Sequence, residues 1–319
     1  MSRSQIIIFL FFLIACSQSV KSDLPVQREN NDNPFIVVLG IAQDAGYPQT
    51  GCYQPHCMRA WNDPSLRRKV VSLALVDPVT KKKWLFEATP DIKEQLYELN
   101  KIAPDSVYSF DGVFMTHGHM GHYTGLMQLG FESMNVKNLN VYAMPRMHEY
   151  LSTSGPWSQL VGFENIILKP IQDSTKIQLT ENISVMPFTV PHRDEFTETV
   201  GFQIIGPDKS LVFIPDIDKW HLWDVNLAAE HSSWDYAFVD ATFYQDGELP
   251  GRDMSKVKHP FVSESFKYFD LLPDDKKSGV YFIHFNHTNP LLIDGSDTQK
   301  EVTAKGFNYA FEGLMVGLE

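Results

Sequence analysis

Residues 117–122 read His117-Gly118-His119-Met120-Gly121-His122, and the apolar run 113–115 precedes them. Three of the 11 histidines of the chain therefore lie in this short stretch. Neutral imidazole is the commonest metal-ligand side chain, and it suits zinc and iron. The apolar run predicts a strand that ends near Thr116, so the histidines lie on a strand-to-helix loop that a rigid sheet can aim at one point. The pattern predicts a metal site rather than a polar turn with solvated histidines.

The spacing of these histidines resembles the His-x-His-x-Asp-His signature of the metallo-β-lactamase superfamily. The chain matches all three histidines and has Gly121 at the position of the aspartate. The resemblance implies an α/β fold, a four-layer αββα sandwich with a metal site at one edge of two sheets. Apolar runs that alternate with turn signals fit a layered α/β domain. The pattern predicts strands at 35–41, 70–77, 84–87, 112–115, 140–143, 183–190, 200–205, 211–214, 236–239 and 280–284, and helices at 91–100, 122–129, 146–151 and 262–269.

Three later residues follow apolar runs at points where a strand is expected to emerge: His192, Asp216 and His284. In order and approximate spacing they resemble the later metal-binding motifs of the superfamily. The resemblance implies two metals bridged by Asp216. The first metal would be held by His117, His119 and His192, and the second by His122, Asp216 and His284.

A centre of this kind implies zinc, one or two ions per chain, with iron and manganese as alternatives. Metal-bound water would be acidified to hydroxide and would attack an electrophilic carbon or phosphorus. Asp216 and His122 are assigned as the catalytic residues. Asp91 resembles the early acidic motif that supports the histidine loop from outside the ligand shell. Its carboxylate also suits a helix N-terminus, and the two roles are compatible.

Gly121 removes one ligand and one negative charge from the second metal of the family pattern. We therefore expect that site to be weaker or to be completed by another donor. The nearby candidates are Asp218, His259 and His287. The expected consequence is unequal metal affinity, with one tightly bound metal per chain.

Two of the 3 cysteines, Cys52 and Cys57, flank His56 in the segment 51–57. This segment resembles a zinc-binding Cys-x-Cys-x-x-Cys loop of some superfamily members, with Gln54 at the middle cysteine. His56 could supply a third ligand, with the fourth from elsewhere. A structural zinc and a disulfide are equally compatible with the pattern, since a disulfide can form outside the cytosol, and free thiols are the third alternative.

The N-terminus has the features of an export signal. Arg3 precedes the apolar run 6–14, which is too short to span a bilayer as a mature helix. The residues ending at Cys16 resemble a bacterial lipobox, and ordinary cleavage before Ser22 is the alternative. We expect a signal peptide at 1–15, a flexible tether at 16–34 and a metallo-β-lactamase-like domain at 35–319. The protein would be exported to the periplasmic side and meet the membrane only through its N-terminal lipid.

The formal net charge of −12 argues against a nucleic-acid partner, because binding to phosphate backbones needs a clustered basic surface. No Gly-rich phosphate loop and no Gly-x-Ser-x-Gly element occurs in the sequence. Nucleotide-driven and serine mechanisms are therefore disfavoured. The expected partner is a small-molecule substrate.

The run 283–290 is similar to a motif of the family of coenzyme PQQ (pyrroloquinoline quinone) biosynthesis protein B, as are 251–254 and His259-Pro260. That family works in the cytoplasm and often lacks the full histidine cluster, so this chain reads as an exported relative that keeps a hydrolase-like site.

Three functions follow from these features, in order of preference. The first is a metal-dependent hydrolase of a small-molecule phosphodiester or ester. The second is a metal-dependent oxygenase or oxidase in the biosynthesis of a PQQ-like cofactor. The third is a non-catalytic, lipid-anchored binding protein on a scaffold that Gly121 has impaired.

Overall fold

The computed structural model describes residues 33–319, which form two seven-stranded sheets. The first sheet has the order β14-β1-β2-β3-β4-β5-β6, and the second has the order β13-β12-β11-β10-β9-β8-β7. The strands of the first sheet are β1 (Phe35–Gly40), β2 (Ser72–Asp77), β3 (Lys82–Phe86), β4 (Ser109–Phe114), β5 (Leu139–Ala143), β6 (Ile166–Pro170) and β14 (Met315–Gly317). Those of the second are β7 (Ile177–Gln178), β8 (Ser184–Thr189), β9 (Val200–Ile205), β10 (Ser210–Ile214), β11 (Tyr236–Asp240), β12 (Val280–Ile283) and β13 (Asn308–Tyr309).

The two faces of the first sheet bury alternate side chains, as the period of a strand requires. In β1, Ile36 and Val38 join the core that also contains the second sheet, whereas Val37 packs into a separate core with the helices. Phe86 on β3 reaches Phe202 on β9 with 5.5 Å between ring centroids. The main core therefore lies between the two sheets.

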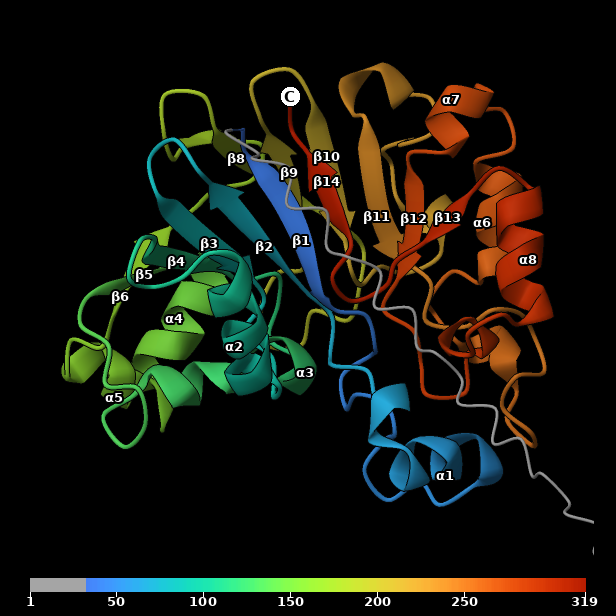
Figure 1. The fold of residues 1–319 in the computed structure, drawn as a ribbon, viewed down its shortest axis with the longest axis horizontal. Helices are drawn as coiled ribbons and strands as arrows, with labels where there is room; N and C mark the ends of the chain where they lie inside the picture. The colour runs from blue at the N-terminus through green and yellow to red at the C-terminus, as the bar shows by residue number, and fades with distance from the viewer. Residues whose placement is uncertain (1–32) are drawn as a thin grey trace, which may run out of the picture. The chain divides into compact units, whose positions relative to one another are not determined.

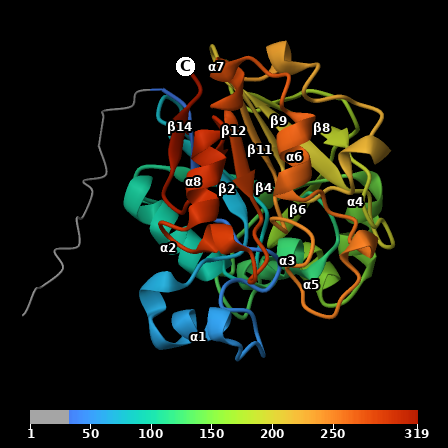
Figure 2. The ribbon, with the colours of Figure 1, turned by 90° about the vertical axis from the view of Figure 1, so that its right-hand side faces the viewer.

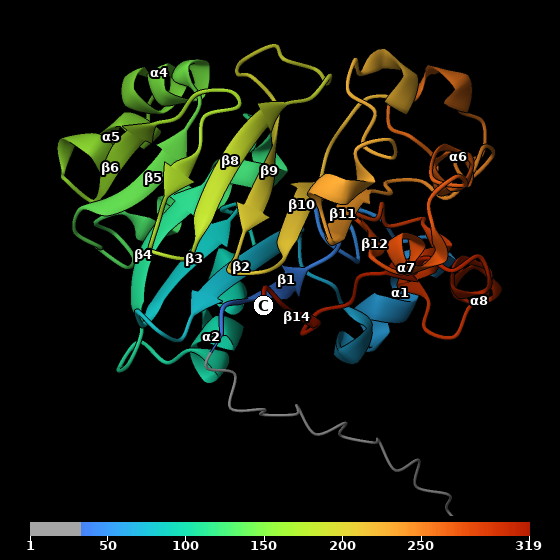
Figure 3. The ribbon, with the colours of Figure 1, turned by 90° about the horizontal axis from the view of Figure 1, so that it is seen from above.

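Helices cover the outer side of each sheet (Figures 1 and 3). Ile92 and Leu99 of α2 pack on the first sheet, and Phe266 of α6 and Val302 of α8 pack with the second. The predicted four-layer α/β fold is confirmed. The helices are α1 (Pro55–Asn62), α2 (Ile92–Ile102), α3 (Met120–Tyr123), α4 (Pro145–Thr153), α5 (Trp157–Gly162), α6 (Val262–Tyr268), α7 (Asp274–Lys277) and α8 (Asp297–Ala304).

The strand directions bring several loops to one edge. β1 and β3 are both antiparallel to β2, and β3 is parallel to β4, so β1, β3 and β4 run the same way. In the second sheet β8, β10, β11 and β12 share a direction by the same reasoning. Figures 1 and 2 show α1 and α3, which follow β1 and β4, at the same end of the sheets.

Within residues 33–319, no helix is both long and apolar enough to cross a lipid bilayer. The expected signal peptide and the expected lipidation site, Cys16, lie outside the described residues.

Candidate metal centre

The six residues assigned by motif to the metals all follow the carboxyl ends of strands. The three histidines of the loop 117–122 follow β4, and His192, Asp216 and His284 follow β8, β10 and β12. Ligands in layered α/β proteins bind beyond the carboxyl ends of strands, where loops from several strands meet. The structure brings all six side chains into one cluster.

The first group consists of His117, His119, His192 and Asp216, whose ligand atoms all lie within 4.8 Å of one another. Asp216 Oδ2 lies 3.4 Å from His117 Nε2 and 3.3 Å from His192 Nε2. The same oxygen lies 3.7 Å from His122 Nε2, which belongs to the neighbouring group. Asp216 is therefore placed between two sets of imidazoles, as the bridging assignment requires.

The second group consists of His122, His284 and Asp44, a residue that the sequence analysis did not select. Asp44 Oδ1 lies 3.1 Å from His122 Nε2 and 3.8 Å from His284 Nε2. Asp44 stands in the loop after β1, so it too follows the carboxyl end of a strand at this edge.

Neighbouring side chains fix the imidazoles by their Nδ1 atoms and leave Nε2 for the site, as second-sphere partners of metal ligands do. Asp218 Oδ1 is hydrogen-bonded to His192 Nδ1 at 3.1 Å. Glu87 Oε2 lies 3.4 Å from His122 Nδ1 and pairs with it by charge, without a hydrogen bond. Threonine hydroxyls hold the Nδ1 atoms of two others, Thr116 at His117 and Thr242 at His284, each at 2.9 Å. His119 is reversed, with Nδ1 toward His117 and Nε2 toward Glu195.

The donor atoms fit a metal. His192 Nε2, His284 Nε2 and Asp216 Oδ1 are buried and have no hydrogen-bond partner. Buried polar atoms in proteins almost always find a partner, so these unpaired atoms are available as donors to a cation. A set of imidazole and carboxylate donors suits zinc, iron or manganese.

The charges of the cluster also suit a cation. Burial raises the pKa of Asp216, but the imidazoles of His192 and His259 outweigh it and hold the pKa well below its usual value. Burial lowers the pKa of His117 far enough to keep this imidazole neutral. Burial lowers the pKa of His122 as well, but Glu87 and Asp44 outweigh this effect and hold it well above its usual value. Metal binding at His122 therefore displaces a proton.

The expected support of the histidine loop by Asp91 stays a prediction. The Asp91 carboxylate accepts a hydrogen bond from the backbone N–H of Val70 at 2.8 Å, and Asp91 is the N-cap residue of α2. β3 ends at Phe86, so the acidic residue at its carboxyl end is the fully buried Glu87, which lies beside His122.

Backbone strain marks two of the strand ends. Glu87 and His284 have positive φ angles of 82° and 68°. Such conformations are costly for residues other than glycine and cluster at functional sites, where the surrounding structure holds them.

The three candidates for replacing the missing aspartate have different surroundings. Asp218 orients His192 through its Nδ1 atom, as described above. His259 Nδ1 contacts Asp240 Oδ2 at 2.8 Å and Asp216 Oδ1 at 3.1 Å. Of these two contacts, the one with Asp240 is a hydrogen bond. The ligand atoms of His259, Asp216, Asp240 and His284 all lie within 4.8 Å of one another, so His259 stays a candidate ligand. His287 turns toward the cysteine loop.

A separate group of donors lies at the cysteine loop. It consists of Cys52, His56, Cys57 and His287, whose ligand atoms lie within 4.8 Å of one another. Both cysteines are free, and Cys52 Sγ lies 3.4 Å from His56 Nε2. Burial and the hydrogen bond with Cys52 raise the pKa of Cys57 to about 12, so a cation is needed to make it a thiolate. Two cysteines and two histidines suit a closed tetrahedral zinc site, and His287 supplies the fourth donor that the sequence left open.

A Cys52→Ser variant should release about one zinc per chain and melt at a lower temperature, because structural zinc contributes directly to folding. Zinc content and thermal unfolding of the reduced protein measure both effects. A His148→Ala variant, which removes a histidine outside both groups, serves as the control. A Cys52–Cys57 disulfide found by non-reducing mass spectrometry would contradict this assignment.

A cavity of about 530 Å³ opens beside the metal cluster, and His192 and His259 are part of its wall. Four cationic side chains line the same cavity: Arg193, Arg252, Lys256 and Lys258. This concentration of positive charge contrasts with the net charge of −12 of the whole chain. The cavity therefore suits an anionic ligand.

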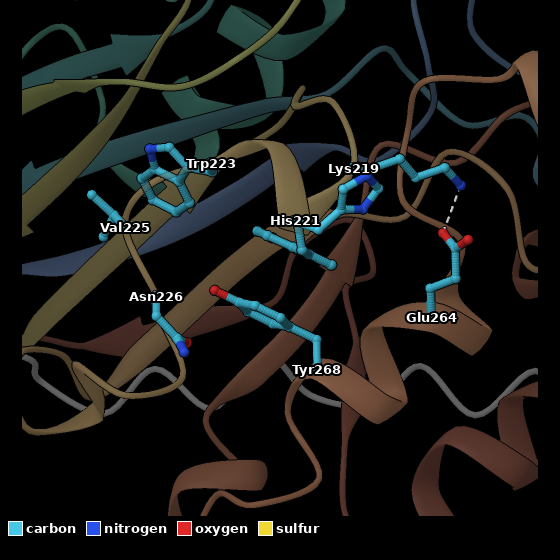
Figure 4. A pocket seen from close by; sticks show the side chains of 8 residues that line it. Lys219, His221, Trp223, Val225, Asn226, Glu264 and Tyr268 are labelled. Carbon is cyan, nitrogen blue, oxygen red and sulfur yellow. Dashed lines mark hydrogen bonds and ion pairs between the residues drawn. The ribbon is translucent and has the colours of Figure 1, made fainter.

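A second cavity, of about 440 Å³, lies between the segment 219–226 and α6. Figure 4 shows Trp223, His221 and Tyr268 around it, with the Lys219–Glu264 ion pair at one side. None of the residues of the metal cluster lines this cavity. Of the two cavities, the first is therefore the one that adjoins the metal cluster.

Glu248 lies in the loop beside the first cavity, and its protonation should make the stability of the folded protein depend on pH. Its carboxylate accepts hydrogen bonds from Thr288 Oγ1 and from the Tyr244 N–H, and burial raises its pKa to about 7. The native state then holds a proton that the unfolded state releases near 4.5, so stability should fall as pH rises from about 4.5 to about 7.

Between about pH 4.5 and about pH 7, the free energy of unfolding of a Glu248→Gln variant should fall less than that of the native protein. Denaturant midpoints at pH 5 and pH 7.5 measure the difference. Glu181→Gln, on an exposed turn, should behave as the native protein does. An equal change of the denaturant midpoint between the two pH values in the native protein and in Glu248→Gln would refute the raised pKa of Glu248.

Known proteins share sequence and fold with this chain. A family model described as the β-lactamase superfamily domain matches residues 82–285. Coenzyme PQQ synthesis protein B of Acinetobacter baumannii (strain ACICU) is 26% identical over 314 residues, covering 89% of this chain and 99% of that protein. The crystal structure of zinc-bound PqqB from Methylobacterium extorquens has a TM-score of 0.75 and 23% identity, covering 89% of this chain and 100% of that chain. A diphosphatase of the PhnP family has a TM-score of 0.62 and 21% identity, covering 90% of this chain and 98% of that chain. These two structural likenesses show a common fold.

Proposed function

The chain belongs to the metallo-β-lactamase superfamily, and we propose that it is a metal-dependent hydrolase of a small anionic molecule, a phosphodiester in preference to a carboxylic ester. The observation that carries the proposal is the position of Asp216. Its Oδ2 atom lies 3.3, 3.4 and 3.7 Å from the Nε2 atoms of three histidines that belong to two ligand groups. Zinc or a similar divalent ion held there would acidify a water molecule and polarise an oxygen of the substrate.

His259 is suited to give a proton to the leaving group. Its Nδ1 atom is hydrogen-bonded to Asp240 and lies 3.1 Å from Asp216 Oδ1, and the residue is part of the cavity wall. Burial lowers the pKa of His259, but these two carboxylates outweigh it and hold the pKa well above its usual value. A histidine that stays protonated near neutral pH can act as a general acid.

The cationic wall of the cavity favours a phosphodiester over a neutral ester. Arg193, Arg252, Lys256 and Lys258 surround the space beside His259. A phosphodiester carries a negative charge through the reaction, and these side chains would hold it by charge and by hydrogen bonds.

The proposal is tested with a generic phosphodiester, bis(p-nitrophenyl) phosphate, and a neutral ester, p-nitrophenyl acetate. The native protein should hydrolyse the phosphodiester, lose this activity with a chelator and regain it with zinc. His119→Ala should lose metal from the first group and lose turnover with it. Unchanged turnover in His119→Ala would refute the hydrolase assignment.

A second candidate function rests on the curated relatives, which are named for coenzyme PQQ synthesis. In that case the same ligands would serve a metal-dependent oxygenase or oxidase in the formation of a PQQ-like cofactor. Iron in protein purified without added metal, together with oxygen consumption, would favour this candidate. Failure to retain any metal would instead favour a non-catalytic binding protein.

A further inference from the structure

The loop after β1 brings a carboxylate into the metal cluster from outside the histidine signature. We propose that Asp44 is a ligand of the second metal and supplies the carboxylate that Gly121 lacks. This inference rests on the metal centre proposed above and specifies how its second half is completed.

The contacts of Asp44 are those of a ligand rather than of a surface acid. Its Oδ1 atom lies 3.1 Å from His122 Nε2 and 3.8 Å from His284 Nε2. His284 Nε2 is fully buried and has no hydrogen-bond partner, so it points at this oxygen without bonding to it. Two imidazole nitrogens and one carboxylate oxygen within 4.8 Å of one another form a donor set that suits zinc.

Gly121 shows that the two carboxylate positions exclude each other. A Cβ atom added to Gly121 would lie 2.4 Å from Asp44 Cα and 2.6 Å from Asp44 Oδ1. Real Cβ atoms essentially never come this close to another heavy atom. Asp44 therefore fills the space into which a side chain at position 121 would project. The loss of the aspartate and the approach of Asp44 are two parts of one structural change.

Backbone hydrogen bonds hold the Asp44 loop beside the strand that carries His284. The N–H of Gln43 donates to the carbonyl of Phe285 at 2.8 Å, and the N–H of Gly46 returns to the carbonyl of Gln43 at 2.8 Å. Gly46 has a φ angle of +73°, which glycine adopts readily and which lets the loop turn tightly after Asp44. The position of Asp44 is thus set by the fold and not by its side chain alone.

The charge balance of the second site changes as a result. The expectation of one tightly bound metal rested on the aspartate that Gly121 lacks, and it did not include Asp44 as a replacement. With Asp44 in that place, the second metal keeps two histidines, the bridging Asp216 and one further carboxylate. We therefore expect two metals in the centre with similar retention.

The experiment measures zinc stoichiometry by elemental analysis after dialysis, and zinc affinity by competition with a chromophoric chelator. Asp44→Ala should retain about one zinc per chain fewer than the native protein. Its affinity for the second zinc should fall by at least about 10- to 100-fold, the range seen when only an outer partner of a metal ligand is removed. The control Gln43→Ala trims the same loop and should retain the native zinc content.

The outcomes separate this inference from the proposed function. Native zinc content and affinity in Asp44→Ala would overturn the ligand role of Asp44 and leave the metal centre intact. A native protein that binds no zinc at the histidine cluster would overturn both. Circular dichroism and retention of the first zinc show that the variant is folded.

A second variant tests the mutual exclusion without removing a ligand. Gly121→Ala should displace Asp44 and weaken binding of the same zinc, because its methyl group would collide with the Asp44 backbone. Gly162→Ala adds the same methyl group where no atom lies within 4 Å and should bind zinc as the native protein does. Native affinity in Gly121→Ala would contradict the close approach of Asp44.

Discussion

Replacing Asp216 by asparagine should remove zinc from both halves of the centre and lower turnover of the phosphodiester by roughly a thousandfold or more. The magnitude follows from the several kcal/mol that a catalytic metal contributes, since each 1.36 kcal/mol is a factor of ten in rate. Asp216 has this effect because one of its oxygens faces both ligand groups. An amide keeps the shape of the carboxylate but removes the negative charge between the two cations.

Zinc content and kcat of Asp216→Asn measure these losses, and Asp111→Asn is the matched control. Asp111 is a carboxylate of β4 that pairs with Lys82 and lies outside both ligand groups. Its variant should keep both metals and native turnover. If Asp216→Asn keeps one of the two metals at native affinity, Asp216 does not bridge them.

The three single replacements make a set with different expected zinc losses. His119→Ala affects the first group, Asp44→Ala the second, and Asp216→Asn both. A defect in folding would lower the zinc occupancy of all sites together, including that of the proposed site at Cys52 and Cys57. The pattern of losses, rather than any single loss, therefore tests the architecture of the centre.

The sequence predicted the strands of the fold where a strand contains a long apolar run. Every predicted strand coincides with an observed one, and 200–205 matches β9 at both ends. The four missed strands are short or lie at edges: β7 and β13 have two residues each, β14 has three, and β6 is an edge strand that is open on one face. Such strands are held by their neighbours and leave little pattern of their own.

The helices that the sequence did not predict also lack a clear pattern of their own. In α8 only Gln299 and Val302 are buried, so the helix has no apolar stripe to detect. α1 lies in the cysteine loop and begins at Pro55. The sequence pattern of this segment indicated a ligand motif and not a helix. The predicted helix 122–129 is a short α3 followed by a 3₁₀ helix at Thr124–Leu129.

Motif spacing selected six residues that the structure brings into one cluster, because that signal is local. It did not select Asp44 or Glu87, whose positions at the site depend on which strands run parallel. Both stand at or just after the carboxyl end of a strand that points to the same edge. Local sequence contains the strands but not their order in the sheet. A search for acidic residues after every predicted strand would have found both, together with many false candidates.

The His259→Asn variant should lose activity according to how much the leaving group needs a proton. An alkyl phosphodiester has a basic leaving oxygen, so removing a general acid should lower its turnover by about 10²- to 10⁴-fold. A p-nitrophenolate ion leaves without a proton, so bis(p-nitrophenyl) phosphate should be affected far less. The reason lies in the contacts of His259, whose Nδ1 atom is held by Asp240 at 2.8 Å while the ring borders the cavity.

The measurement compares kcat for the two phosphodiesters and the zinc content of the same samples. His221→Asn, a histidine on the wall of the second cavity, should change neither. Zinc content separates two roles for His259, because the ligand atoms of His259, Asp216, Asp240 and His284 also lie within 4.8 Å of one another. Loss of zinc in His259→Asn would identify a ligand, whereas native zinc with a loss confined to the alkyl substrate would identify a proton donor. An equal loss on both substrates with native zinc would exclude the general-acid role, because a proton donor acts on the leaving oxygen alone.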